Sequence, residues 1–222
     1  MFYVCETYEK TIIFNIAILT GWFVPYTYVY SFFFSNRDVD GSPEYTWVST
    51  VPIHLSLLPS ITALAYATHP YATTYEWLFS ETDVVFRLYE QLWLSVFIAH
   101  MMKDFVVSRM TMLYIFHHIA SIAPAVVFLF GKQQPAIFCV GCTIMELGSA
   151  THTLAVLYPN SRRLQMLYKH GMTLVNSLCL IILVFYTENN LNDPLRLFMV
   201  AIGAMFCILR QQYTIQYMKH FE

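Results

Sequence analysis

The chain has 222 residues, of which 57% are hydrophobic, 17% aromatic and only 12% charged. The charged share is about half of that in an ordinary soluble domain, which excludes a soluble globular protein and indicates a single polytopic membrane domain. The formal net charge of -2 and the pI near 6.4 exclude the basic surface that nucleic-acid binding requires.

Apolar runs long enough to cross about 30 Å of hydrocarbon recur along the whole chain. Polar breaks separate these runs into seven predicted transmembrane helices, so we expect an all-α fold. The predicted spans are residues 11–34, 47–68, 84–107, 112–130, 135–157, 170–187 and 195–215. The first run is too long for a signal peptide and has no clear cleavage site, so we expect it to stay attached. The predicted organisation is an N-terminal span and loop (1–44), a membrane domain (45–215) and a short tail (216–222).

Basic residues fall unequally on the two sides of the predicted spans. The first side has four, which are Lys10, Arg87, Lys132 and Arg196. The second side has eight, which are Arg37, Lys103, Arg109, Arg162, Arg163, Lys169, Arg210 and Lys219. By the positive-inside rule the second side faces the cytosol, so the N-terminus is predicted to be lumenal and the C-terminus cytosolic. We expect Lys103 and Arg210 to extend toward the membrane surface as anchors.

Few ionisable residues lie within the predicted spans. Each needs a partner or a wet cavity, because a charge at the bilayer centre costs at least about 2.5 kcal/mol. They are Glu90, His100, Lys103, Asp104, His117, His118, Glu146, His152 and Arg210. With about 1.5 Å of rise per residue, the histidines of three successive spans lie about 8 to 10 Å from the cytosolic side. We therefore expect these histidines to share one layer of the membrane.

The adjacent residues His117 and His118 point about 100° apart on a helix, so one is expected to face a cavity while the other supports it. Asp104 lies one turn after His100 and is placed to orient an imidazole. A histidine there would serve as a general base or as a transient acyl acceptor. The alternative is that these rings only join helices through hydrogen bonds.

Other polar and sulfur-containing residues receive no catalytic role. The sequence has no HxxxH motif, so we expect no di-iron site and no metal. Cys139 and Cys142 form a CxxC within a predicted span, where buried thiols are favoured over redox or zinc chemistry. Three further histidines are given no function: His54, His69 and His220.

Two motifs of the chain resemble the TLC family (TRAM, Lag, CLN), which includes the ceramide synthases. Asp104 is followed by HHIASI at 117–122, and CTIMELGSATHTL follows at 142–154. The resemblance covers roughly residues 45–215. It implies six helices in a ring around a lipid-accessible cavity, a further peripheral helix, and a histidine pair that faces the cavity.

The sequence departs from the ceramide synthases in the second motif. Ser149 and His152 stand where those enzymes carry an aspartate pair, which disfavours ceramide synthesis itself. The chain is more similar to the small TLC-domain proteins. Their roles are in phospholipid composition, membrane fluidity, lipid acylation and, in one branch, cargo handling in the endoplasmic reticulum.

The leading hypothesis is a membrane lipid-metabolic protein of acyltransferase type. His117 or His118 would act as base or acyl acceptor, and Asp104 and His152 would orient it or balance its charge. The predicted lining of the lipid cavity comprises His100, Glu146, Ser121 and Ser149. Acyl-CoA would be a co-substrate, with no bound cofactor.

The predicted partners are membrane lipids, and the predicted location is the endoplasmic reticulum or another endomembrane. The oligomeric state and the acyl length stay open. One alternative is a non-catalytic regulator of membrane lipid composition or a cargo adaptor of the same fold. Transport is the least favoured function, because the sequence has no convincing internal repeat.

Overall fold

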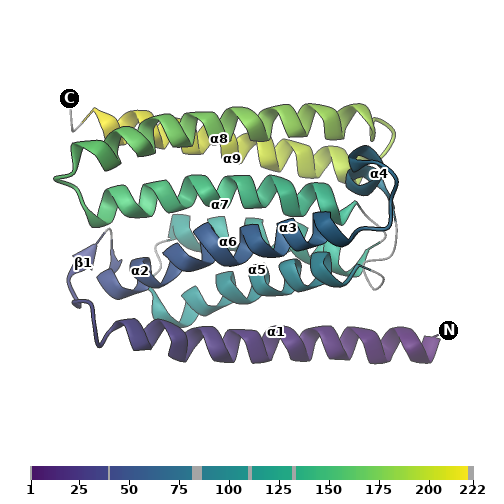
Figure 1. The fold of residues 1–222 in the computed structure, drawn as a ribbon, viewed down its shortest axis with the longest axis horizontal. Helices are drawn as coiled ribbons and strands as arrows, with labels where there is room; N and C mark the ends of the chain where they lie inside the picture. The colour runs from purple at the N-terminus through teal and green to yellow at the C-terminus, as the bar shows by residue number, and fades with distance from the viewer. Residues whose placement is uncertain (1, 40, 82–86, 110–111, 132–133, 220–222) are drawn as a thin grey trace.

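The computed structural model describes residues 2–39, 41–81, 87–109, 112–131 and 134–219, and most of them are helical. The long helices lie side by side along one direction (Figure 1). In chain order the elements are α1 (Phe2–Tyr30), β1 (Asp38–Val39), β2 (Ser42–Pro43), α2 (Glu44–Pro52), η1 (Ile53–Leu57), α3 (Leu58–Thr68), α4 (Thr74–Phe79), α5 (Leu88–Val107), α6 (Met112–Phe130), α7 (Pro135–Leu157), α8 (Arg162–Glu188) and α9 (Pro194–Met218). The predicted all-α class is confirmed.

Within the described residues, five helical segments are long and apolar enough to cross a membrane. They are Glu9–Tyr30, Glu44–Thr68, Pro135–Leu157, Arg162–Glu188 and Pro194–Met218. The helices α5 and α6 run beside them (Figure 1), but α5 contains Glu90, Lys103 and Asp104, and the apolar part of α6 is shorter. The chain is therefore an integral membrane protein, while the number of seven spans stays a prediction.

Two short elements outside the long helices were not predicted. The polar loop after α1 forms a hairpin in which Asp38 of β1 pairs with Pro43 of β2. Its turn contains Gly41, whose φ of 81° lies in the region that only glycine adopts readily. The helix α4 begins with a capping box between Thr73 and Glu76. Residues 84–86, at the start of the predicted third span, lie outside the described residues.

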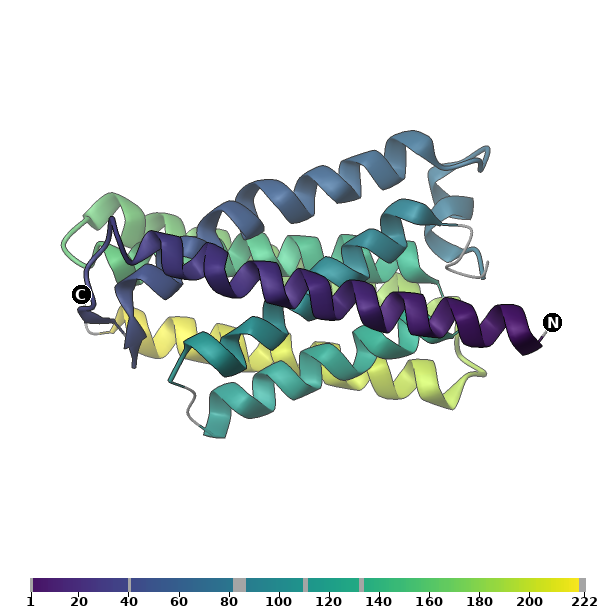
Figure 2. The same ribbon diagram turned by 90° about the horizontal axis from the view of Figure 1, so that it is seen from below.

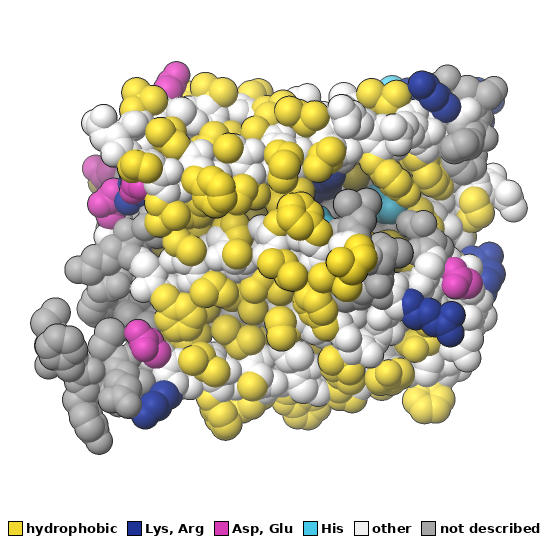
Figure 3. Space-filling model, turned by 180° about the vertical axis from the view of Figure 1, so that it is seen from behind, with side chains coloured by type: hydrophobic (Ala, Val, Ile, Leu, Met, Phe, Trp, Pro, Cys, Tyr) yellow, Lys and Arg dark blue, Asp and Glu magenta, His cyan; other side chains and the backbone are white. Residues whose placement is uncertain are grey.

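The surface of the protein is apolar around its middle. Charged side chains gather toward the two ends, and hydrophobic side chains cover the face between them (Figure 3). Large apolar side chains are exposed on several helices, among them Trp22 (70%), Phe14 (64%) and Phe198 (62%). This pattern fits a surface that faces lipid, because apolar side chains are stable in hydrocarbon without burial.

The helix α5 lies at the centre of the packing. It packs against α1, α3 and α6, and α1 crosses it at an angle (Figure 2). Trp93, Leu94 and Phe97 of α5 are almost fully buried in the main apolar core. On the other side of the molecule α8 packs between α7 and α9. The described ends of the chain lie at opposite ends of the molecule (Figure 1).

Candidate active site in the membrane interior

A buried ion pair joins α5 to α6. The Nζ atom of Lys103 lies 2.5 Å from Oδ1 of Asp104, and Oδ2 of the same carboxylate lies 3.0 Å from Nε2 of His118. Lys103 has no exposed surface, so the prediction that it reaches the membrane surface is wrong. The physical reason is the adjacent carboxylate, which compensates a buried ammonium that would otherwise be strongly destabilising.

The ring of His118 is fixed at both nitrogens. Its Nδ1 donates to the backbone carbonyl of Tyr114 over 2.9 Å, while its Nε2 faces Asp104. These two contacts, one within α6 and one to α5, hold the ring in a single orientation. His118 is 2% exposed. It is therefore the supporting member of the histidine pair.

A second buried cluster contains a histidine to which the sequence analysis gave no role. The Nε2 atom of His54 lies 3.0 Å from Nε2 of His100 and 3.2 Å from Oε2 of Glu146. His54 belongs to η1, a π-helical turn that follows Pro52 directly. Proline removes a backbone donor, and such turns are frequent at functional sites. The prolines that flank IHLSLL were the signal in the sequence that marked this position.

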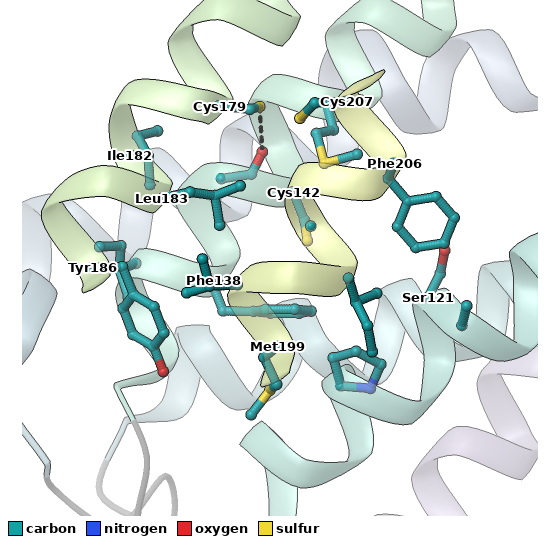
Figure 4. Close-up of a pocket in the computed structure, with 18 of the residues that line it drawn as sticks. Ser121, Phe138, Cys142, Cys179, Ile182, Leu183, Tyr186, Met199, Phe206 and Cys207 are labelled. Carbon is teal, nitrogen blue, oxygen red and sulfur yellow. Dashed lines mark hydrogen bonds between the residues drawn. The ribbon is translucent and has the colours of Figure 1, made fainter. Parts of the chain in front are cut away.

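A cavity lies between α6, α7, α8 and α9, with about 920 Å³ of empty space that includes its open mouth. Its polar lining includes His117, Glu146, Arg210 and Ser121. The rest is mostly apolar or sulfur-containing (Figure 4), with Phe128, Ile137, Phe138, Cys142, Met145, Cys179, Ile182, Leu183, Met199, Val200, Phe206 and Cys207 among the residues. The Cys179 thiol points to the carbonyl of Gly141 over 3.6 Å, which is an ordinary structural contact.

The cavity has a lateral side at α6 and α9. These helices contribute His117 and Phe206, whose ring centroids lie 5.4 Å apart, yet the two helices pack little against each other. Seen from behind, the apolar surface is hollowed, and histidine and basic side chains are visible inside (Figure 3). The cavity is thus reached from the face of the molecule that hydrophobic side chains cover (Figure 3).

The histidine pair divides as expected, with one ring at the cavity and one behind it. His117 lines the cavity, and no hydrogen bond joins its ring to another described residue. Its ring packs at 5.5 Å from His118 and 6.2 Å from Tyr114. Asp104 contacts His118 rather than His117.

Two of the four residues predicted to line the cavity are found there, Ser121 and Glu146. His100 is absent from the lining because it is buried against His54. Ser149 is also absent, and its hydroxyl donates to the carbonyl of Met145 over 3.3 Å. The prediction was wrong for these two residues, because His100 points to His54 and the Ser149 hydroxyl bonds back to its own helix.

His152 lies in an aromatic cluster instead of the cavity. Its ring centroid is 5.1 Å from that of Tyr168, 5.5 Å from Tyr213 and 6.1 Å from Trp47. Its Nε2 atom has no hydrogen-bond partner among the described residues. Trp47 also contacts Tyr114, so an aromatic ring separates His152 from the histidine pair. The histidines that were predicted to share one layer therefore belong to separate groups, and their common depth in the membrane stays a prediction.

Arg210 is not the surface anchor that the sequence suggested. Its Nη2 atom donates to the carbonyl of Met145 over 2.8 Å and contacts the sulfur of Met172 at 3.1 Å, and the residue lines the cavity. Without Lys103 and Arg210 the basic residues of the two sides number six against four. The predicted cytosolic side keeps the larger number. Lys132 and His220 lie outside the described residues.

The arrangement permits proton transfer at the edge of an apolar cavity. An imidazole without a fixed partner, such as that of His117, is able to accept a proton from a hydroxyl or amine. No group of three or more His, Cys, Asp or Glu side chains in the described part of the chain is arranged to hold a metal ion.

Comparisons with protein-family models, with curated proteins and with solved structures found no match to this chain.

Proposed function

We propose that this integral membrane protein transfers an acyl group, with the acyl chain in the cavity between α6 and α9 and His117 as the reacting base. The observation that carries the proposal is the position of His117. Its ring lines a mostly apolar cavity, while the neighbouring His118 is held by Asp104 and by the Tyr114 carbonyl. The resemblance of HHIASI to the TLC family supports the same reading.

The proposed reaction moves one acyl group from a donor to an acceptor. The donor is acyl-CoA or a phospholipid, and the acceptor is a lipid amine or hydroxyl. His117 takes the proton of the acceptor as its nitrogen or oxygen attacks the acyl carbonyl carbon. The bond to the leaving thiol or alcohol then breaks, and the leaving group receives the proton from the imidazolium. Transient acylation of His117 itself is the alternative route.

The helix contacts are compatible with the proposed ring. The segment from α2 to α3 packs on both α5 and α7. From there α7 packs on α8 and α8 packs on α9, while on the other side α5 packs on α6. The helix α1 packs outside, on α5 and α2. In this proposal α1 is the peripheral helix, and the acyl chain lies on the side of the ring that α6, α7, α8 and α9 form. We place the protein in the endoplasmic reticulum or another endomembrane, with the N-terminus lumenal.

The test uses purified protein in liposomes with radiolabelled acyl-CoA, or a labelled phospholipid, and a mixture of lipid amines and alcohols. A His117→Gln variant is expected to lose at least about 100-fold in transfer rate, the scale of general-base catalysis. His170→Gln is the control, because His170 is exposed on α8. Equal transfer by wild type and His117→Gln would contradict the proposal, as would no transfer by the folded wild type.

A non-catalytic lipid regulator or cargo adaptor is the second candidate function. One observation favours it: the carboxylate of Asp104 is committed to Lys103 and His118, so it does not orient His117. In that case lipid profiles of cells would depend on the presence of the protein but not on His117. Lipidomics of a deletion strain complemented with wild type or His117→Gln separates the two functions.

A further inference from the structure

One end of the cavity carries a cation, Arg210, that no described carboxylate pairs with. No ion pair joins Arg210 to a carboxylate of a described residue. A guanidinium remains charged in proteins, and a charge at membrane depth needs a partner or a wet cavity. The Nη2 atom has its carbonyl and sulfur contacts, while Nε and Nη1 make no hydrogen bond with described residues.

The carboxylate of Glu146, at the same end of the cavity, is not the partner that Arg210 needs. Glu146 also lines the cavity, but its Oε2 atom lies 3.2 Å from Nε2 of His54. The same end contains His117. The polar end therefore presents one unpaired guanidinium and one imidazole beside a carboxylate that is held by a histidine. A ligand with one negative charge matches this set better than a dianion, which Glu146 would repel.

The apolar part of the cavity extends from this end in one direction. From Arg210 to Met199 on α9, and from His117 to Phe128 on α6, the lining extends over eleven steps from one residue to the next along each helix. At about 1.5 Å per residue, this is about 16 to 17 Å. Half of a hydrocarbon core of about 30 Å is about 15 Å, which is the reach of acyl chains from one leaflet. The direction is toward the end of the molecule that carries α4 and the N-terminus (Figure 1).

We propose that the cavity binds a long-chain fatty acid as its carboxylate, with the carboxylate on Arg210 and the single alkyl chain along α6 and α9. This inference rests on the proposed function only in placing an acyl chain in the cavity. A carboxylate accepts two parallel N–H bonds from a guanidinium, which makes the pair strong and directional. The alkyl chain replaces water against Phe128, Phe138 and Met199.

Binding is measured with radiolabelled palmitate on protein in nanodiscs, and empty nanodiscs give the background. Wild type and Arg162→Gln, a control at an exposed arginine on α8, are expected to bind equally. Arg210→Gln is expected to weaken binding at least tenfold, and Arg210→Lys less. Acyl transfer is measured in parallel on the same wild-type nanodiscs, because palmitate binding without acyl transfer would support this inference and contradict the proposed reaction.

Two further measurements decide the outcome without relying on the fold of an arginine variant. On the wild type, hexadecanol should compete with palmitate at least tenfold less well, because it lacks the charge. Gly141→Leu places a side chain about five residues of helix beyond Glu146, where an added Cβ meets only Ile182 at 3.9 Å. It should reduce palmitate binding and spare octanoate.

Equal competition by hexadecanol would overturn the proposal. So would unchanged palmitate affinity in folded Arg210→Gln. Competition by lysophosphatidate that is tenfold better than that by palmitate would also overturn the proposal. The preferred ligand would then carry a phosphate headgroup instead of a carboxylate.

Discussion

The Oδ2 atom of Asp104 on α5 lies 3.0 Å from the Nε2 atom of His118 on α6, and the other oxygen of the same carboxylate binds the fully buried Lys103. One carboxylate therefore compensates an ammonium and fixes an imidazole inside a membrane domain. This relationship connects the packing of two helices to the position of the ring that lines the cavity, because His117 is the next residue to His118.

Asp104→Asn is expected to lower the free energy of unfolding by about 3 to 5 kcal/mol, because it leaves the charge of Lys103 buried without a partner. Thermal unfolding in detergent measures the change. Glu188→Gln, at an exposed glutamate, should change stability by less than about 0.5 kcal/mol. Adding Lys103→Met to Asp104→Asn should restore part of the lost free energy of unfolding, because the buried charge is then removed. Equal stability of Asp104→Asn and wild type would show that the ion pair is not required.

His54→Leu tests the second buried cluster. The variant keeps an apolar side chain of similar size but leaves Glu146 without the imidazole that lies 3.2 Å away. We expect a loss of about 3 kcal/mol, as for removal of one partner of a buried pair. Combining it with Glu146→Gln should recover stability, since the unpaired charge is then gone. Full stability of the single variant would mean that Glu146 finds another partner or solvent.

The sequence was sufficient to predict the helical class, because long apolar runs bounded by polar loops have few other solutions in a membrane. It was also sufficient to predict that the rings of His117 and His118 point in different directions, which follows from helical geometry, while their chemical roles stay predictions. His54 was missed because a π-helical turn alters the direction in which a side chain points. Lys103 was misplaced because its position near a helix end suggested the membrane surface, whereas the neighbouring Asp104 stabilises it inside.

Gly148→Ala is expected to disturb the polar end of the cavity. A Cβ atom there would lie 2.8 Å from Nη2 of Arg210 and 3.0 Å from Cγ1 of Val175. The guanidinium is at the end of a flexible side chain and should move, while the contact with Val175 strains the packing of α7 on α8. We predict a loss of about 1 to 3 kcal/mol, typical of overpacking, and weaker palmitate binding.

Gly21→Ala is the matched control, because an added Cβ there meets nothing within 4 Å. It should keep palmitate binding and should not lower stability, since alanine favours helix over glycine. Unchanged palmitate binding in Gly148→Ala would contradict the proposal that palmitate binding depends on the position of the Arg210 guanidinium.

The positions of the two ends of the chain predict the topology. The described ends lie at opposite ends of the molecule (Figure 1), and the larger number of basic residues lies on the side of Lys219. Glycosylation acceptor sites added at each terminus should therefore be modified at the N-terminus only. Modification of both termini would indicate an even number of crossings, and modification of the C-terminus alone would indicate the reverse orientation.

The most direct test of the central claim locates the acyl chain itself. Wild-type protein in nanodiscs is irradiated with a fatty acid that carries a photoreactive group in its alkyl chain, and the modified residues are identified by mass spectrometry. We predict adducts on the cavity lining of α6, α8 and α9, near Phe128, Leu183 and Met199, which excess palmitate removes. Adducts confined to lipid-facing residues such as Phe14 and Trp22 would contradict a lipid-binding cavity.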